Sequence, residues 1–181
     1  MPKPNAPDAQ KATVLKALRE TNARLDRLFR ENPAAAIKEA QRLLSASEPD
    51  DWNHMMIAAG VLVDAGHVLE DRLAVEVGTS LFRRLHEACP ASPDLDYNLA
   101  NGLNALADFG HEPAWSPSLC ARRREARGLY QRAASAQDGM FRSKSLTNTA
   151  NLLKLSYRRL ESYDAYVAER ALQATRAKVE I

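Results

Sequence analysis

The stretch YNLANGL at residues 97–103 decides the fold, because its pattern returns fifty residues later. The second copy reads TNTANLL at residues 147–153, and both copies hold the order Asn-x-Ala-Asn. Self-similarity of this kind is typical of stacked helical hairpins, none of which can bury its apolar face alone. We therefore expect a helical-repeat protein.

Two further series of residues repeat a helical spacing of four and then three. Each series places a small residue before a large aromatic one, on the same side of a helix. The downstream series is Ala126, Tyr130 and Ala133, and the upstream series is Gly78, Phe82 and Leu85. A ladder of this type predicts the contact face of the second helix in a hairpin, where small residues let two backbones approach closely.

Apolar residues recur at helical spacing along almost the whole chain, and Pro, Gly and Asp mark the breaks between them. We expect an all-α fold in which Gly66 ends the third helix in a left-handed conformation. Asp8 and Asn32 are expected to cap the first two helices, with Pro33 at the first helical position of the second. Asp50-Asp51 and Glu70-Asp71 are expected to be capping acids at later helix starts. The eight predicted helices span about residues 8–30, 33–47, 51–65, 68–88, 93–109, 118–136, 140–157 and 161–179.

The eight helices predict one repeat domain over residues 9–179, after a flexible lead over residues 1–8. Four antiparallel hairpins are expected, at about residues 9–47, 51–89, 93–136 and 140–179. A chain of 181 residues has the length of one compact domain or one short repeat array.

Composition excludes several classes of protein. No apolar run approaches the roughly 20 residues of a membrane span, and the start of the chain lacks the apolar segment of a signal peptide. Cys89 and Cys120 are too few for a disulfide framework, which predicts a reduced, cytoplasmic setting.

At Ala100 and at the ladder of Ala126, Tyr130 and Ala133 the chain resembles the tetratricopeptide-repeat (TPR) family. The resemblance covers about residues 51–172 and implies a right-handed superhelical array. Ala59, Ala100 and Ala150 match the small position on the first helix of each TPR hairpin, where we expect neighbouring hairpins to touch backbone to backbone. The 50-residue separation of the two Asn-x-Ala-Asn motifs is longer than the usual period of about 34 residues.

The resemblance to TPR proteins implies a concave groove that binds a peptide or protein segment. In many TPR proteins asparagines in the groove bind the ligand backbone and lysines neighbour its carboxylate. An alternative role for these asparagines is hydrogen bonding between repeats. The residues that match the groove are Tyr97, Asn98, Asn101, Asn104, Lys144, Asn148, Asn151 and Lys154.

Basic residues are concentrated in one later block, since residues 118–159 hold ten Lys/Arg and two Asp/Glu. Such a block attracts an acidic protein surface or nucleic acid, or it is a solvated helix exterior. The motifs also resemble the repeat region of bacterial proteins with a HEPN-type ribonuclease domain, which implies a nucleic-acid-binding accessory as the alternative function. The predicted basic patch contains Arg122, Arg123, Arg124, Arg127, Arg132, Arg142, Arg158 and Arg159.

Catalytic and metal motifs are missing from the sequence. The four histidines are scattered singly, and no metal-ligand spacing, phosphate loop or nucleophile elbow occurs. We therefore expect a non-catalytic scaffold without cofactor or metal, one subunit of a larger protein complex. The last predicted hairpin has no polar capping helix after it, so self-association through that hairpin is a further expectation.

Overall fold

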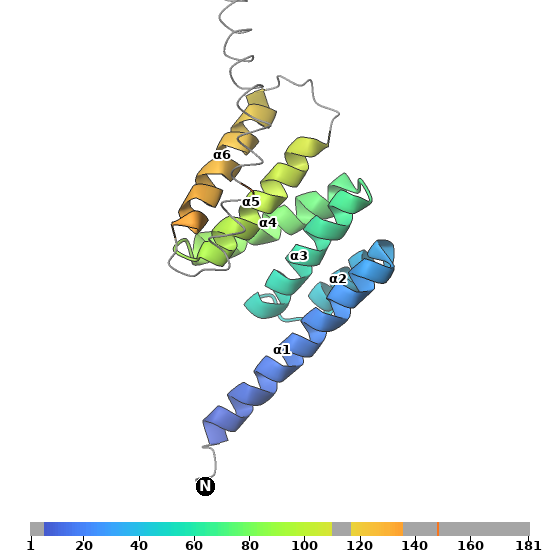
Figure 1. Ribbon diagram of the computed structural model, residues 1–181. Helices are drawn as coiled ribbons and strands as arrows, with labels where there is room; N and C mark the ends of the chain where they lie inside the picture. Colours follow the sequence, from blue (N-terminus) through green and yellow to red (C-terminus); the bar gives the residue numbers. More distant parts are fainter. Residues whose placement is uncertain (1–5, 110–116, 136–147, 149–181) are drawn as a thin grey trace, which may run out of the picture. The chain divides into compact units, whose positions relative to one another are not determined.

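The computed structural model describes residues 6–109, 117–135 and 148, and side chains from residue 11 onward within the first range and from 121 within the second (Figure 1). The described residues form six α-helices and no strand, which confirms the all-α prediction. The chain divides into two compact units, Met1–Pro90 and Ala91–Ile181. Each unit is described by itself below.

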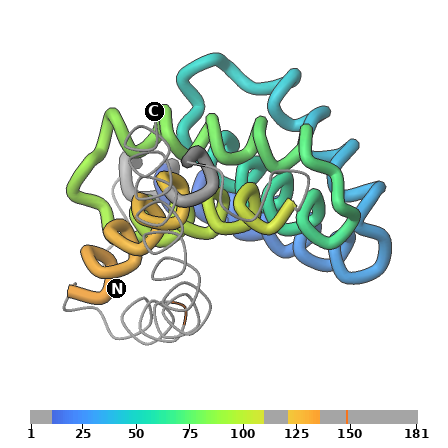
Figure 2. The backbone as a smooth tube through the Cα atoms, turned by 90° about the horizontal axis from the view of Figure 1, so that it is seen from above, coloured from blue at the N-terminus to red at the C-terminus, as the bar shows by residue number. Residues whose placement is uncertain are grey.

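The first unit contains four helices. They are α1 (Ala6–Glu31), α2 (Pro33–Ala46), α3 (Trp52–Val68) and α4 (Arg72–Ala88). Consecutive helices pack against each other, and α1 also contacts α3 (Figures 1 and 2). Helix α1 begins within the predicted flexible lead, two residues before the expected cap at Asp8. Apolar side chains from all four helices form one core cluster: Leu25, Ile37, Ala40, Leu43, Ala58, Leu62, Ala65 and Ala74.

Three helices of this unit start at a side-chain cap that the sequence predicts. The Oδ1 of Asn32 accepts a hydrogen bond from the backbone N of Ala35 at 3.1 Å, directly before Pro33. Asp51 and Asp71 accept in the same way from backbone N atoms three residues later, each at 3.1 Å. These carboxylates satisfy N–H groups that the helix leaves unpaired and favour the positive end of its dipole.

The turn between α3 and α4 differs from the sequence prediction. Gly66 lies inside α3 without a positive φ, and the left-handed residue is Glu70, with φ of 55°. The backbone N of Glu70 donates to the carbonyl of His67, and that of Asp71 donates to the carbonyl of Gly66. This pair of hydrogen bonds is a Schellman ending, displaced by four residues from the predicted one. Consequently α3 is longer than expected and α4 begins later.

Gly66 is required for packing rather than for a turn. A Cβ added there would lie 2.8 Å from Cγ2 of Val75 and 3.0 Å from the Cβ of Ala74. Gly78 meets α3 even more closely, since its Cβ would lie 2.8 Å from the carbonyl oxygen of Ala59. Ala59 therefore marks a contact at backbone distance, as predicted, but its partner is the next helix of the same pair.

The described helices of the second unit are α5 (Pro93–Asp108) and α6 (Pro117–Ala134), which pack against each other. Their shared core contains the predicted ladder of α6 and the apolar face of α5: Leu95, Leu99, Ala100, Leu103, Ala126, Leu129, Tyr130 and Ala133. The predicted helices at 140–157 and 161–179, with Ala150, lie outside the described residues apart from Asn148.

Candidate functional site: the polar face of α5

One face of α5 is lined mainly by polar and aromatic side chains, with Ala105 buried among them. Positions three or four apart share a helical face, so these residues line up along the helix while the buried leucines occupy the other side. The residues of this face, called the α5 polar face below, are Asp94, Tyr97, Asn98, Asn101, Asn104 and Asp108.

Asn101 is the centre of a hydrogen-bond network on this face. Its Oδ1 accepts from the hydroxyl of Tyr130 on α6 at 2.5 Å and from Nδ2 of Asn148 at 3.3 Å. The same Nδ2 of Asn148 donates to the hydroxyl of Tyr97 at 3.2 Å. The two asparagines from the two sequence motifs therefore come together. A hydrogen bond thus joins the two Asn-x-Ala-Asn motifs, which is the kind of contact that the alternative to ligand binding predicts.

Two tyrosines hold the network in place. The rings of Tyr97 and Tyr130 meet edge to face, with centroids 5.9 Å apart and an interplanar angle of 62°. Burial, followed by the nearby hydroxyl of Tyr97, raises the pKa of Tyr130 well above its ordinary value. Tyr130 is therefore neutral at physiological pH and serves as a donor to Asn101.

Asn98 and Asn104 flank this network along the helix but are not part of it. Both side chains are half-buried, and neither makes a hydrogen bond within the part of the chain that the structure describes. Each amide offers a donor and an acceptor at a fixed position, as backbone recognition requires. Of the other predicted groove residues, Lys144, Asn151 and Lys154 lie outside the described residues.

The basic patch requires a correction at Arg123. Its side chain is only 4% exposed, and Nη2 donates to Oδ1 of Asp108 at 3.1 Å. The Nε of the same guanidinium is buried and has no hydrogen-bond partner among the described residues. Arg123 is thus a buried residue of α6 whose charge is matched by Asp108 of α5.

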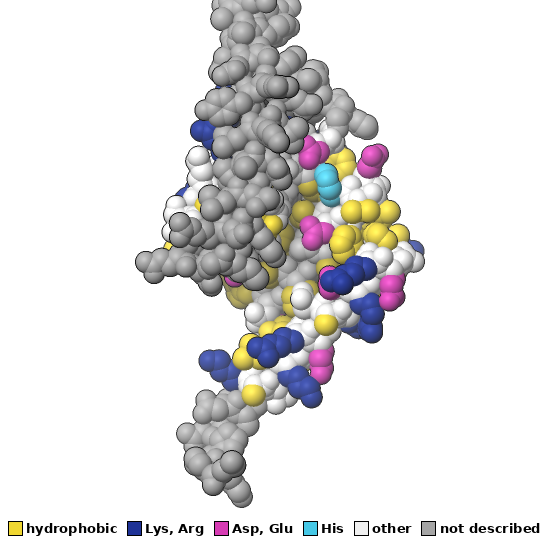
Figure 3. All heavy atoms as spheres, in the orientation of Figure 1, with side chains coloured by type: hydrophobic (Ala, Val, Ile, Leu, Met, Phe, Trp, Pro, Cys, Tyr) yellow, Lys and Arg dark blue, Asp and Glu magenta, His cyan; other side chains and the backbone are white. Residues whose placement is uncertain are grey.

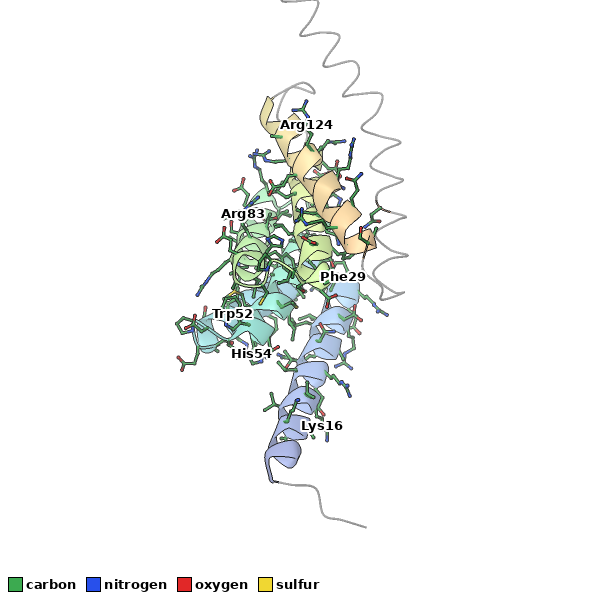
Figure 4. The ribbon with its side chains drawn as sticks, turned by 90° about the vertical axis from the view of Figure 1, so that its left-hand side faces the viewer. Lys16, Phe29, Trp52, His54, Arg83 and Arg124 are labelled. Atoms are coloured by element: carbon green, nitrogen blue, oxygen red, sulfur yellow. The ribbon has the colours of Figure 1, made fainter. Side chains whose placement is uncertain are left out.

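Arg132 also forms an ion pair with a residue of α5. It donates to both carboxylate oxygens of Asp96, from Nη2 at 2.7 Å and from Nε at 3.2 Å. Asp96 is buried, so this two-point bond fixes one helix against the other. The remaining described arginines of the block are exposed Arg124, labelled in Figure 4, and half-buried Arg122 and Arg127. Arg142, Arg158 and Arg159 lie outside the described residues.

Sequence reasoning missed the acidic partners Asp96 and Asp108. A signal was present, since α5 places acids at both ends and α6 carries arginines throughout. An acidic helix followed by an arginine-rich one predicts ion pairs between them, which lowers the charge left for a ligand.

No group of three or more His, Cys, Asp or Glu in the described part of the chain could hold a metal ion. None of the helices found there is long and apolar enough to span a membrane. Cys89 is an exposed free thiol, and the side chain of Cys120 is outside the described set.

Comparison with known proteins adds no identity to these observations. No protein-family model, no curated protein and no solved structure matches the chain. The resemblance to TPR proteins therefore stays a prediction from the sequence motifs, as do the superhelical arrangement and the four hairpins.

Proposed function

We propose that the protein is a non-catalytic helical scaffold that binds an extended segment of another protein along the α5 polar face. The observation that carries the proposal is the pair of half-buried amides at Asn98 and Asn104, which make no hydrogen bond among the described residues. A half-buried amide can exchange its hydrogen bonds to water for those of an extended backbone, which offers it both a donor and an acceptor.

The network around Asn101 supports this use of the face. Tyr97, Tyr130 and Asn148 fix the position of Asn101 between the two unused amides. A rigid row of polar groups loses little conformational entropy when a ligand binds, which favours affinity. Asn101 and Asn148 thus organise the face, while Asn98 and Asn104 contact the ligand.

The test uses a displayed library of random peptides as the probe. Peptides enriched on the wild-type protein are expected to bind Asn98→Ala/Asn104→Ala about tenfold to a hundredfold more weakly, because each lost hydrogen bond contributes about 1 kcal/mol. Asn53→Ala, an exposed asparagine on α3, is the matched control and leaves binding unchanged. Equal binding by the wild type and the double variant contradicts the proposal.

A second measurement concerns the predicted lysines. The resemblance to TPR proteins places Lys144 and Lys154 beside a ligand carboxylate. We expect enriched peptides with a free C-terminus to bind more tightly than their amidated forms, and this difference to vanish in Lys144→Glu/Lys154→Glu. No preference in the wild type would remove the lysines from the site.

The alternative function is nucleic-acid binding through the arginine block. Arg123 is buried, whereas Arg124 is exposed and Arg127 is half-buried, so the test replaces these two arginines of the described part of the block. A labelled single-stranded RNA tests it. Binding that weakens steeply with salt and is lost in Arg124→Glu/Arg127→Glu favours the alternative over the scaffold.

A further inference from the structure

Two exposed apolar surfaces of the first unit lie far from the α5 polar face in sequence and remain unexplained. The first is the front half of α1, residues 11–20, called the overhang below. Every residue of it is exposed except half-buried Leu18. Val14 and Leu15 are 51% and 45% exposed, whereas Leu25, on the same helical face as Val14, is fully buried in the core.

The overhang extends beyond the helices that cover the rest of α1. Figure 4 shows Lys16 on this free part of the helix and Phe29 on the part beside its neighbours. Val14, Leu18 and Leu25 are spaced by four and seven, so the apolar stripe that packs inside the unit continues outward uncovered.

The second surface lies at the turn from α3 to α4. It is called the turn patch and contains Val68, Leu69, Leu73 and Val77, which are 59%, 44%, 69% and 40% exposed. Figure 3 shows hydrophobic side chains gathered at the right-hand edge, where α3 ends in Figure 1. Large apolar side chains that cluster in this way on a surface mark an interaction site.

The charges around the two surfaces are opposite. The overhang carries Lys11, Lys16 and Arg19 against Glu20, whereas residues 69–77 carry Glu70, Asp71 and Glu76 against Arg72. Lys16 pairs with Glu20 at 3.9 Å and Arg72 with Glu76 at 2.8 Å, each within its own helix. The charges beyond those pairs are basic on the overhang and acidic beside the turn patch.

The two surfaces cannot meet within one chain. Helix α1 is continuous over 26 residues, and its overhang points away from the end of α3 (Figure 1). We propose that a second copy of this chain completes both surfaces, with the overhang of each copy lying on the turn patch of the other. Reciprocal contacts of this kind close a twofold dimer, and an amphipathic helix on an apolar surface is a common mode of recognition.

Mass measurement by light scattering, across a range of protein concentrations, tests the proposal. The wild type is expected to be a dimer. Val14→Asp/Leu15→Asp and Leu73→Asp/Val77→Asp are each expected to weaken dimerisation about tenfold or more, because an introduced charge loses its hydration in the contact. Ala34→Asp/Gln41→Asp adds the same charge at exposed positions of α2 and serves as the control. All six substitutions lie at exposed positions, and circular dichroism checks that the helices persist.

Mixing the two disrupted variants gives the sharpest result. One variant retains an intact turn patch and the other an intact overhang, so the mixture is expected to form a heterodimer through one remaining contact. A strictly monomeric wild type overturns the proposal. A dimer that only one of the two double variants disrupts also overturns it. That outcome, with no heterodimer on mixing, is what a dimer of overhang on overhang or of turn patch on turn patch predicts. Because the variants leave α5 unchanged, failure here is distinguishable from failure of the proposed function.

Discussion

The α3–α4 pair and the α5–α6 pair each consist of two consecutive helices, yet different contacts hold each pair together. Between α3 and α4 the backbones come close where Gly78 lies against the carbonyl of Ala59, with Val63 and Leu62 around it. Between α5 and α6 the contact contains Asp96 with Arg132, Asp108 with Arg123, and Tyr130 with Asn101. The first pair is held by close apolar packing, and the second adds matched polar groups to its apolar core.

The difference shows what each pair can contribute. Where the backbones of α3 and α4 touch, there is no room for a polar side chain that could bind a ligand. A contact made by polar groups fixes donors and acceptors at its edge, where the α5 polar face is available. The following predictions test this contrast, from the largest expected effect to the smallest.

Removal of Asp96 should have the largest effect. Asp96→Ala deletes both hydrogen bonds to Arg132 and is expected to destabilise the α5–α6 pair by about 2–3 kcal/mol, since bonds between charged groups are the strong ones. Hydrogen exchange of the α5 and α6 amides measures the change. Asp50→Ala is the control, because Asp50 is 82% exposed and its bond to Arg84 at 3.2 Å contributes little. Equal effects of the two substitutions would contradict the role given to Asp96.

A single methyl group should disturb the α3–α4 pair. Gly78→Ala places a Cβ against the carbonyl of Ala59 and is expected to cost about 2 kcal/mol through overpacking. Chemical denaturation, combined with exchange of the α4 amides, gives the value.

The matched control for Gly78→Ala is Gly60→Ala, in α3. The nearest atom to the new Cβ there is Cζ of Phe82 at 4.0 Å, an ordinary contact. Since alanine favours helix over glycine by about 1 kcal/mol, this variant is expected to be as stable as the wild type or more so. A stable Gly78→Ala protein would show that the pair does not depend on close approach.

Phe82 and Tyr130 are the aromatic residues of the two ladders, and each can be replaced by the residue type of the other. Tyr130→Phe removes the donor to Asn101 and is expected to cost about 1–1.5 kcal/mol. Phe82→Tyr buries a hydroxyl in an apolar contact and is also expected to destabilise. Both values come from thermal unfolding of the intact chain. If Tyr130→Phe is neutral, the network does not hold α5 to α6.

Acid should weaken the first unit slightly through Glu39. Hydrogen bonds from Arg42, and then from Arg24, hold the pKa of Glu39 at about 2, below its ordinary value of 4.5, although partial burial opposes them. Because the folded-state pKa is the lower one, the stabilisation is complete above pH 4.5 and is lost as the pH falls toward 2.

The expected loss is below about 1 kcal/mol, since both arginines are exposed. The difference in unfolding free energy between the wild type and Glu39→Gln, measured across this pH range, gives the contribution. A difference that does not change with pH would contradict the assignment.

Much of the fold follows from the sequence, because helix periods and caps act over a few residues. Asn32, Asp51 and Asp71 cap helices where the pattern predicts. The ladders Gly78/Phe82/Leu85 and Ala126/Tyr130/Ala133 are buried as expected, since such a series has one physical use between crossing helices.

The predictions for Gly66 and Arg123 are wrong for the same reason, since contacts with another helix decide the role of each residue. Gly66 was assigned to a turn because glycine commonly ends helices, but close packing against Val75 also requires glycine. Arg123 was assigned to a basic patch because local sequence does not reveal a partner fifteen positions earlier. The bond from Asn148 to Asn101 spans 47 residues, so local sequence does not show which asparagines of the predicted groove bind each other.

The left-handed backbone at Glu70 has a consequence for the rotation of α4. The hydrogen bonds of that turn fix the linker at three residues, Leu69 to Asp71. One inserted residue would rotate α4 by about 100° about its axis. Gly78 would then leave the carbonyl of Ala59, and a bulkier neighbour would face it. The length of the linker thus determines which face of α4 packs against α3.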